Sequence, residues 1–92
     1  MQIRFKNRHG EIVETVAADE IPQTKERLQD LAKAGLAGFY EWDERAFWPK
    51  PDFRHNAPHV AELSDASGAL LYVYSIADLV RDKKRHLTTR RF

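Results

Sequence analysis

The chain contains no cysteine, a single methionine and only four glycines among its 92 residues. The lack of cysteine excludes a disulfide scaffold, a thiolate zinc site and a cysteine nucleophile. No apolar run approaches the roughly 20 residues needed to cross a bilayer. The first ten residues alternate charged and apolar side chains, which is not the pattern of a signal peptide. We therefore expect a soluble, cytoplasmic protein without a membrane partner, folded as a single domain over residues 1–92.

The formal net charge of +1 conceals an uneven distribution of charge along the chain. Residues 1–80 hold 13 acidic and 9 basic residues, whereas residues 81–92 form a basic end that we interpret as a helix end and tail. Such a block binds nucleic acid when its cations neutralise phosphates and release counterions. It is equally typical of a solvated helix end with a frayed terminus. The basic residues of this block are Arg81, Lys83, Lys84, Arg85, Arg90 and Arg91.

Two pairs of strands are predicted from alternating and β-branched residues. The first pair covers residues 1–6 and 11–17 around a turn that ends at Gly10, and the second covers 60–63 and 69–74 around a turn that ends at Gly68. The two segments match at an offset of 58 residues, which duplication or convergence would both explain.

A helix is predicted after each pair of strands. Pro22 suits the first position of a helix over 22–34, and Gly35 is placed to stop it. Ser75, with Asp78 three residues later, predicts a capping box at the start of a second helix that runs to about His86.

The predicted fold class is therefore α+β, with an antiparallel sheet built from two β-hairpins, each followed by a helix. In order along the chain this is ββα, an aromatic segment, then ββα again, with the helices on one face of the sheet.

The segment from Phe39 to Phe53 carries six of the ten aromatic residues, interspersed with prolines. Short strands are predicted at 39–42 and 46–48. In a domain this small most aromatic side chains are needed in the core. Because side chains alternate across a strand, however, they cannot all point inward. Exposed aromatics mark partner sites, so we predict a small interaction module that binds a protein partner or a second copy of itself through Tyr40, Trp42, Trp48 and Phe53.

The alternative prediction is a nucleic-acid-binding accessory or regulatory protein that uses the basic C-terminal helix and tail. Arg4, Lys6 and Arg8 on the first hairpin would add to its basic surface if they face outward. The chain contains no zinc finger or RNA-binding signature, so binding would be mostly to phosphates and strongly dependent on salt.

Residues suited to catalysis or metal binding do not form a recognisable set. Carboxylates among the aromatics could have raised pKa values, but they lie next to Arg45 in the chain. His55 and His59 have the i, i+4 spacing of metal ligands, but Pro58 lies between them and no third ligand follows. We therefore expect no enzyme activity, no catalytic residues, no metal and no cofactor.

Overall fold

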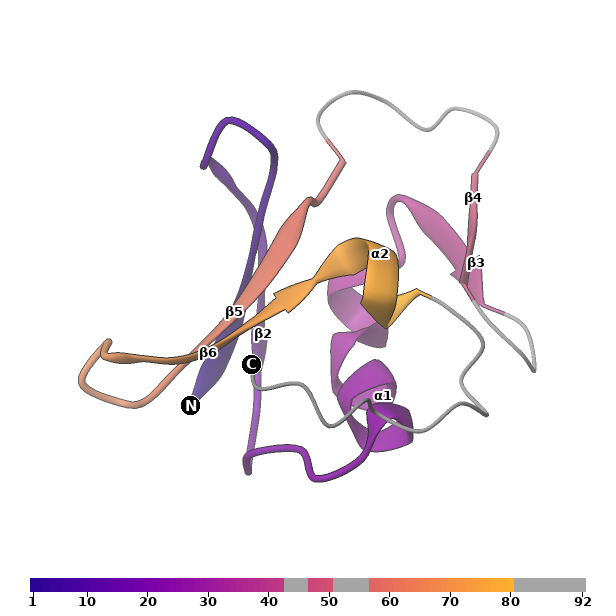
Figure 1. The fold of residues 1–92 in the computed structure, drawn as a ribbon. Coiled ribbons are helices and arrows are strands. Elements are labelled where there is room, and N and C mark those ends of the chain that lie inside the picture. The colour runs from indigo at the N-terminus through magenta and orange to yellow at the C-terminus, as the bar shows by residue number, and fades with distance from the viewer. Residues whose placement is uncertain (43–46, 51–56, 81–92) are drawn as a thin grey trace.

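The structure, a computed structural model, describes residues 1–42, 47–50 and 57–80. Within these ranges the chain forms a small α+β fold, as its sequence predicts (Figure 1). Its elements, in chain order, are β1 (Gln2–Lys6), β2 (Ile12–Ala17), α1 (Lys25–Leu36), β3 (Tyr40–Trp42), β4 (Phe47–Pro49), β5 (Val60–Ser64), β6 (Leu70–Ser75) and the single-turn helix α2 (Ile76–Leu79).

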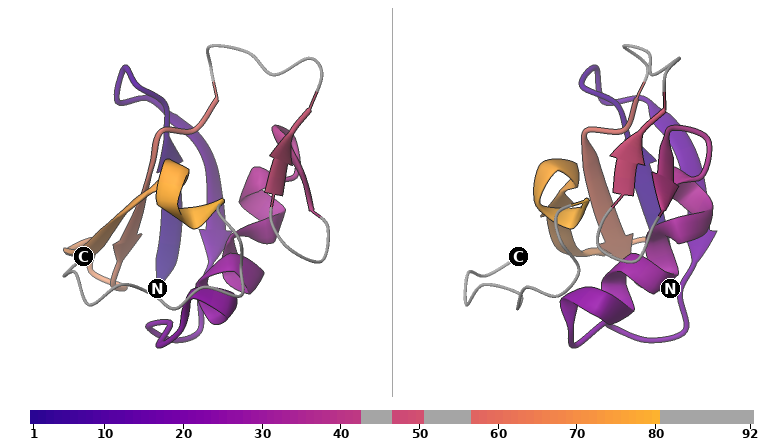
Figure 2. Two further views of the ribbon diagram at one scale, coloured as in Figure 1. Left: turned by 45° about the vertical axis from the view of Figure 1, so that its right-hand side comes forward. Right: turned by 90° about the vertical axis from the view of Figure 1, so that its right-hand side faces the viewer.

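Four of the strands form one antiparallel sheet in the order β2-β1-β5-β6. Both helices lie on the same face of this sheet, and β3 and β4 form a separate pair beside α1 (Figures 1 and 2). No helix or strand of the described residues covers the other face, which we call the open face. The strands β2 and β6 are the two edges of the sheet.

The core lies between the sheet and the two helices, and the alternation in β1 determines which side chains enter it. Ile3 and Phe5 have no exposed surface, whereas Gln2, Arg4 and Lys6 are half-buried on the open face. Fully burying one large apolar side chain stabilises a fold by roughly 1.5–3 kcal/mol. The other fully or almost fully buried apolar residues of the strands and helices are Leu28, Ala32, Leu36, Ala61, Leu63, Tyr74, Ile76 and Leu79.

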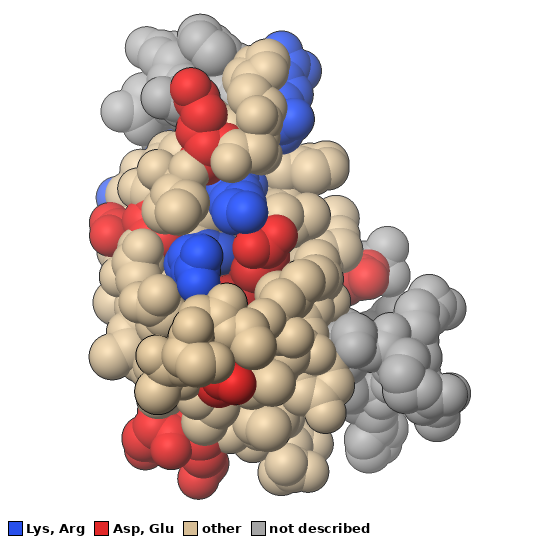
Figure 3. All heavy atoms as spheres, turned by 90° about the vertical axis from the view of Figure 1, so that its left-hand side faces the viewer, with Lys and Arg blue, Asp and Glu red and all other residues tan. Residues whose placement is uncertain are grey.

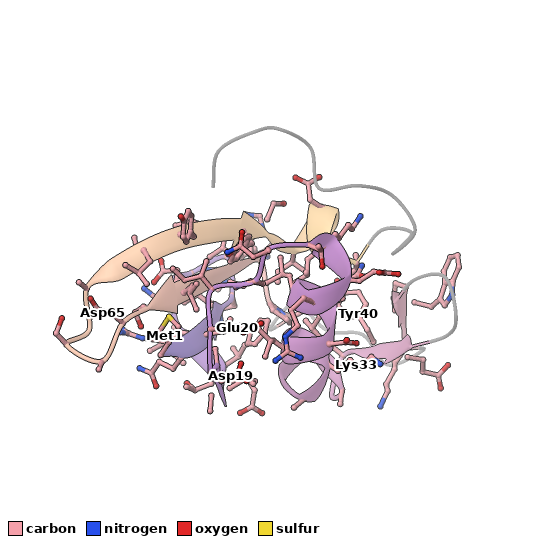
Figure 4. The ribbon with its side chains drawn as sticks, turned by 90° about the horizontal axis from the view of Figure 1, so that it is seen from below. Met1, Asp19, Glu20, Lys33, Tyr40 and Asp65 are labelled. Carbon is pink, nitrogen blue, oxygen red and sulfur yellow. The ribbon has the colours of Figure 1, made fainter. Side chains whose placement is uncertain are left out.

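Helix α1 begins later than the sequence predicts. The N-cap is Thr24, whose hydroxyl oxygen accepts a hydrogen bond from the backbone N–H of Arg27 at 3.1 Å. The prediction that Pro22 opens the helix is therefore wrong; Pro22 is buried before the cap. Arg27 also pairs with Asp19 at 3.1 Å and with Glu20 at 3.3 Å, which joins the first turn of α1 to the segment that follows β2 (Figure 4).

Gly35 does not stop α1, contrary to the prediction, because the helix continues through Leu36 to a C-cap at Ala37. Its function is in packing. A Cβ atom at position 35 would lie 2.2 Å from Cε2 of Phe5, closer than real Cβ atoms come to anything. Gly35 thus lets the backbone of α1 approach the ring of Phe5 in the middle of the sheet.

Helix α2 also departs from the prediction at both ends. Ser75 is its N-cap, but the Ser75 side chain makes no capping hydrogen bond, so the predicted capping box is wrong. Val80 is the C-cap, so the predicted continuous helix to His86 is wrong as well. Residues 81–92 lie outside the described part of the chain. The buried side chain of Gln29 donates a hydrogen bond to the carbonyl oxygen of Leu79 at 2.7 Å, which links α1 to α2.

The turn between β1 and β2 is organised by Asn7, which is almost completely buried. Its side-chain oxygen accepts hydrogen bonds from the backbone N–H groups of His9 at 2.9 Å and Glu11 at 3.0 Å. Gly10 follows with a φ of 83°, a conformation that side chains disfavour. This is the turn chemistry expected of Asn followed by Gly.

The turn between β5 and β6 repeats these bonds. One carboxylate oxygen of Asp65 accepts from the backbone N–H groups of Ser67 and Ala69, both at 2.9 Å, and Gly68 has a φ of 90°. The Ser67 hydroxyl also donates to this oxygen, and together these bonds hold the pKa of Asp65 below its ordinary value of 3.8. Asp65 therefore occupies the position of Asn7 in an equivalent turn, 58 residues further on.

The register of the two hairpins matches as well. In the first hairpin the register shifts after Phe5, so that Lys6 lies opposite Ile12. In the second it shifts after Leu63, so that Ser64 lies opposite Leu70. The offset of 58 residues relates both shifts. The same offset does not relate the helices, because α1 begins at Lys25 and α2 begins directly after β6.

The close contact at Gly35 predicts the effect of adding one methyl group. Gly35→Ala should destabilise the fold by roughly 1–3 kcal/mol through overpacking against Phe5, although alanine is the better helix former by about 1 kcal/mol. Gly38→Ala is the matched control, because a Cβ there meets nothing within 4 Å. Chemical denaturation measures both; equal effects of the two substitutions would contradict the packing role of Gly35.

The lowered pKa of Asp65 predicts a pH-dependent contribution to stability. Because the folded state favours the carboxylate, this contribution is present above the ordinary pKa and is lost as the pH falls through the lowered value. Asp65→Asn should keep the turn, since Asn7 forms the same backbone bonds, but should flatten the acid side of the stability profile. Unfolding free energies measured at acidic and neutral pH test this, and an unchanged acid slope would contradict it.

Candidate interaction surfaces

The strands β3 and β4 form a hairpin outside the main sheet. Tyr40 pairs with Pro49, and Glu41 pairs with Trp48. The backbone N–H of Lys50 donates to the carbonyl oxygen of Phe39 at 3.0 Å, which closes the base of the hairpin where it leaves α1. Both strands correspond to those predicted in the aromatic segment.

Tyr40 holds this hairpin against the rest of the molecule. Its side chain is half-buried and packs against the core, close to α1 (Figure 4). Burial raises the pKa of the Tyr40 hydroxyl above its ordinary value. Of the predicted partner-binding residues, Tyr40 therefore contributes mainly to packing.

Trp48 lies at the surface of the same hairpin. It is 53% exposed and lies opposite Glu41, whose side chain is also exposed. Trp42 contributes its backbone to β3, while its side chain is outside the described part of the structure, as is the whole of Phe53. Among the predicted partner-binding residues whose side chains are described, Trp48 is the one that a partner can reach most fully.

The open face is a second surface, which the sequence analysis did not single out. The large apolar residues Ile12, Leu70 and Val73 are 53%, 55% and 40% exposed. Their register partners Lys6, Ser64 and Glu62 place all three on this face. Apolar residues on both faces of the predicted strand 69–74 were the available signal.

Charged residues in the middle of the open face are engaged with neighbours. Lys6 forms an ion pair with Glu62 at 3.0 Å, and Arg4 donates to the hydroxyl oxygen of Ser64 at 3.1 Å. Figure 3 shows basic and acidic side chains side by side on this face, with uncharged side chains around them. The predicted addition of Arg4 and Lys6 to a phosphate-binding surface therefore competes with these contacts.

At the edge of the sheet, Tyr72 and Tyr74 extend the core toward β6. Their rings stack with centroids 6.3 Å apart. Tyr74 is almost fully buried. Burial, together with the neighbouring Tyr72, raises the pKa of Tyr74 to about 12. This region favours the neutral phenol.

Residues for chemistry do not converge in the described part of the chain. Within it, no three His, Cys, Asp or Glu side chains come close enough to hold a metal ion. His59 is exposed, and His55 lies outside the described ranges, as do all six predicted nucleic-acid-binding residues between 81 and 91. None of the helices within these ranges has the length and hydrophobicity needed to span a membrane.

Comparison with known proteins gives no relative. No protein-family model matches the chain, and neither the curated proteins nor the solved structures include a significant match. Any functional inference must therefore come from the surfaces described above.

The raised pKa of Tyr74 predicts a loss of stability at alkaline pH. The folded state retains the phenol proton up to about pH 12, whereas an unfolded chain releases it near 10, so the contribution of Tyr74 is complete below pH 10 and is lost as the pH rises through this interval. Tyr74→Phe should therefore reduce the dependence of unfolding free energy on pH between about 10 and 12. Denaturation at several alkaline pH values checks this, with Tyr72→Phe as the comparison; an unaltered slope in Tyr74→Phe would exclude the assignment.

Proposed function

We propose that this chain is a small non-catalytic interaction module that binds a protein partner or a second copy of itself through the β3–β4 hairpin. The observation that supports this is the exposure of Trp48 on a hairpin that Tyr40 anchors to the core. A tryptophan that is half in water retains much apolar surface for a partner to bury. Tryptophan is also among the residues that contribute most to interface energies.

The way the hairpin is held supports this proposal. Cross-strand pairing of Glu41 with Trp48 and the hydrogen bond from Lys50 to Phe39 fix the backbone on both sides of the indole. A partner would then bind a preformed surface, so less ordering entropy would oppose association. Exposed Glu41 beside Trp48 provides a polar group at the rim of such an interface.

Charge favours a protein partner over nucleic acid for the described residues. Residues 1–80 are net acidic, and Lys6 and Arg4 already contact Glu62 and Ser64. Nucleic-acid binding through the basic block at 81–91 stays a prediction from sequence. Fluorescence anisotropy with labelled DNA and RNA, comparing the full chain with a chain ending at Val80, would detect it as binding that salt weakens and truncation removes.

We also propose that the two β-hairpins are copies of one unit, as the predicted ββα repeat implies. The matching turns at Asn7 and Asp65 and the matching register shifts support this for the hairpins. The helices do not support it, because they begin at different distances from the preceding strand. A repeated hairpin would give the sheet two equivalent edges, β2 and β6.

The proposed role of Trp48 predicts that binding and folding can be separated. Trp48→Ala should weaken association with the partner by roughly 2 kcal/mol or more. Because the side chain is largely exposed, the unfolding free energy should change by only about 0.5 kcal/mol. Quantitative affinity capture of partners by the full chain, together with denaturation of each variant, measures both effects.

Ile12→Ser is the matched control, since Ile12 has the same 53% exposure as Trp48 but lies on the open face. Capture should survive this substitution. Capture lost with Ile12→Ser and retained with Trp48→Ala would place the interface on the open face and overturn the proposal. Unfolding of Trp48→Ala would show that the indole belongs to the core.

A further inference from the structure

The edge strand β6 presents unpaired backbone to solvent. In the described residues it pairs with β5 on one side and with no strand on the other. The backbone N–H of Ile76 donates to the carbonyl oxygen of His59 at 3.1 Å, which fixes the phase of the antiparallel ladder. Because bonded pairs alternate along such a ladder, Tyr72 and Tyr74 bond toward β5. The backbone groups of Val73 and Ser75 therefore point away from the sheet.

Strand β6 also lacks the features that protect an edge from pairing. Its six residues, LLYVYS, include no charge, no proline and no glycine. Four of them are β-branched or aromatic or otherwise large and apolar, and Leu70 and Val73 remain substantially exposed. Natural edge strands usually carry charges, proline or bulges that prevent pairing with another chain.

The other edge makes the contrast specific. Strand β2 lies at the same position in a matching hairpin, yet it carries Glu14 where β6 has Tyr72 and Thr15 where β6 has Val73. Asp19 and Glu20 follow closely after β2. The two edges share their backbone geometry, and the edge without charge is β6.

We propose that two copies of this chain associate through β6, pairing antiparallel about a two-fold axis at Val73. Pairing between identical strands brings each residue near its own copy, so a charged strand would repel itself; β6 has no charge to repel. A second copy is therefore the partner that this strand fits best. This surface is distinct from the Trp48 hairpin, so the inference does not depend on the proposed function.

The ladder phase and the side-chain directions select the register. Centring the axis on Val73 lets its outward N–H and C=O bond to the same groups of the other copy. It also places Tyr72 of one copy opposite Tyr74 of the other, with both side chains on the helix face. A register centred between Tyr72 and Val73 would pair residues from opposite faces, which an antiparallel ladder does not allow.

The result is a continuous eight-stranded sheet in the order β2-β1-β5-β6-β6-β5-β1-β2. Because the axis is perpendicular to the sheet, the helices of both copies lie on one face and the two open faces form one surface. Val73 from each copy meets at the centre of that surface. The interface is the same patch on both copies, as closed two-fold dimers require.

Sedimentation equilibrium over a range of protein concentrations tests this proposal on the full chain. The average mass should rise from 10.7 kDa toward twice that value as the concentration increases. Val73→Lys should keep the chain monomeric, because it places two like charges at the axis. Thr15→Lys, at the equivalent position of β2, should still dimerise. Circular dichroism confirms that both variants are folded.

A cysteine-scanning experiment tests the register without disrupting the strand. The chain has no cysteine of its own, so Val73→Cys introduces a single thiol. Bonded antiparallel pairs have Cα atoms about 5.5 Å apart, which is within the range that a disulfide can span. Mild oxidation should therefore convert Val73→Cys to a covalent dimer faster than Thr15→Cys.

Three outcomes would overturn the proposal. The first is a wild-type chain that remains monomeric at every concentration, which would leave β6 for an extended segment of another protein. The second is a dimer that survives Val73→Lys. The third is equal cross-linking of the two cysteine variants, which would show that the contact is not specific to β6.

Discussion

The contact between Gly35 and the ring of Phe5 sets the distance between α1 and the sheet. Phe5 lies on β1, one of the two central strands, and its ring occupies the space that a side chain at position 35 would need. With the helix this close, Leu28, Ala32 and Leu36 reach the buried side of the sheet and complete the core. The fold is consequently one-sided, with the apolar packing concentrated between the helices and one face of the sheet.

A one-sided fold leaves more of the sheet accessible than a sheet with helices on both faces. Here the open face and the two edges are free for contacts within the described residues, while the small β3–β4 hairpin projects beside α1 (Figure 2). Two nearly equivalent hairpins have edges of unlike chemistry, one carrying Glu14 and the other lacking charge. That difference, on a shared backbone geometry, is the strongest indication that β6 is used for association.

The sequence predicted the elements that depend on local chemistry. Alternation identified the strands of the main sheet, and Asn or Asp followed three residues later by Gly identified both turns, because the side chain bonds the backbone within the turn itself. Prediction failed where tertiary contacts decide the outcome. Gly35 resembles a helix stop in sequence, and only the position of Phe5 reveals that it is a packing glycine.

The candidate surfaces were predictable to a lesser degree. The excess of aromatic residues located the β3–β4 hairpin, but which ring is buried depends on how the hairpin sits on the core, and this separates Tyr40 from Trp48. The open face and the β6 edge escaped prediction because strand order cannot be derived from the periodicity of a single strand. A strand rich in apolar residues is typical of a central position, whereas β6 is an edge.

Amide hydrogen exchange measured at increasing protein concentration tests the central claim most directly, namely that the two edges differ in use. The backbone N–H of Val73 and that of Thr15 both point away from the sheet, and they occupy equivalent positions on β6 and β2. If β6 pairs with a second copy, exchange at Val73 slows as the concentration rises while exchange at Thr15 stays fast. Fast exchange at both positions at every concentration would contradict the claim.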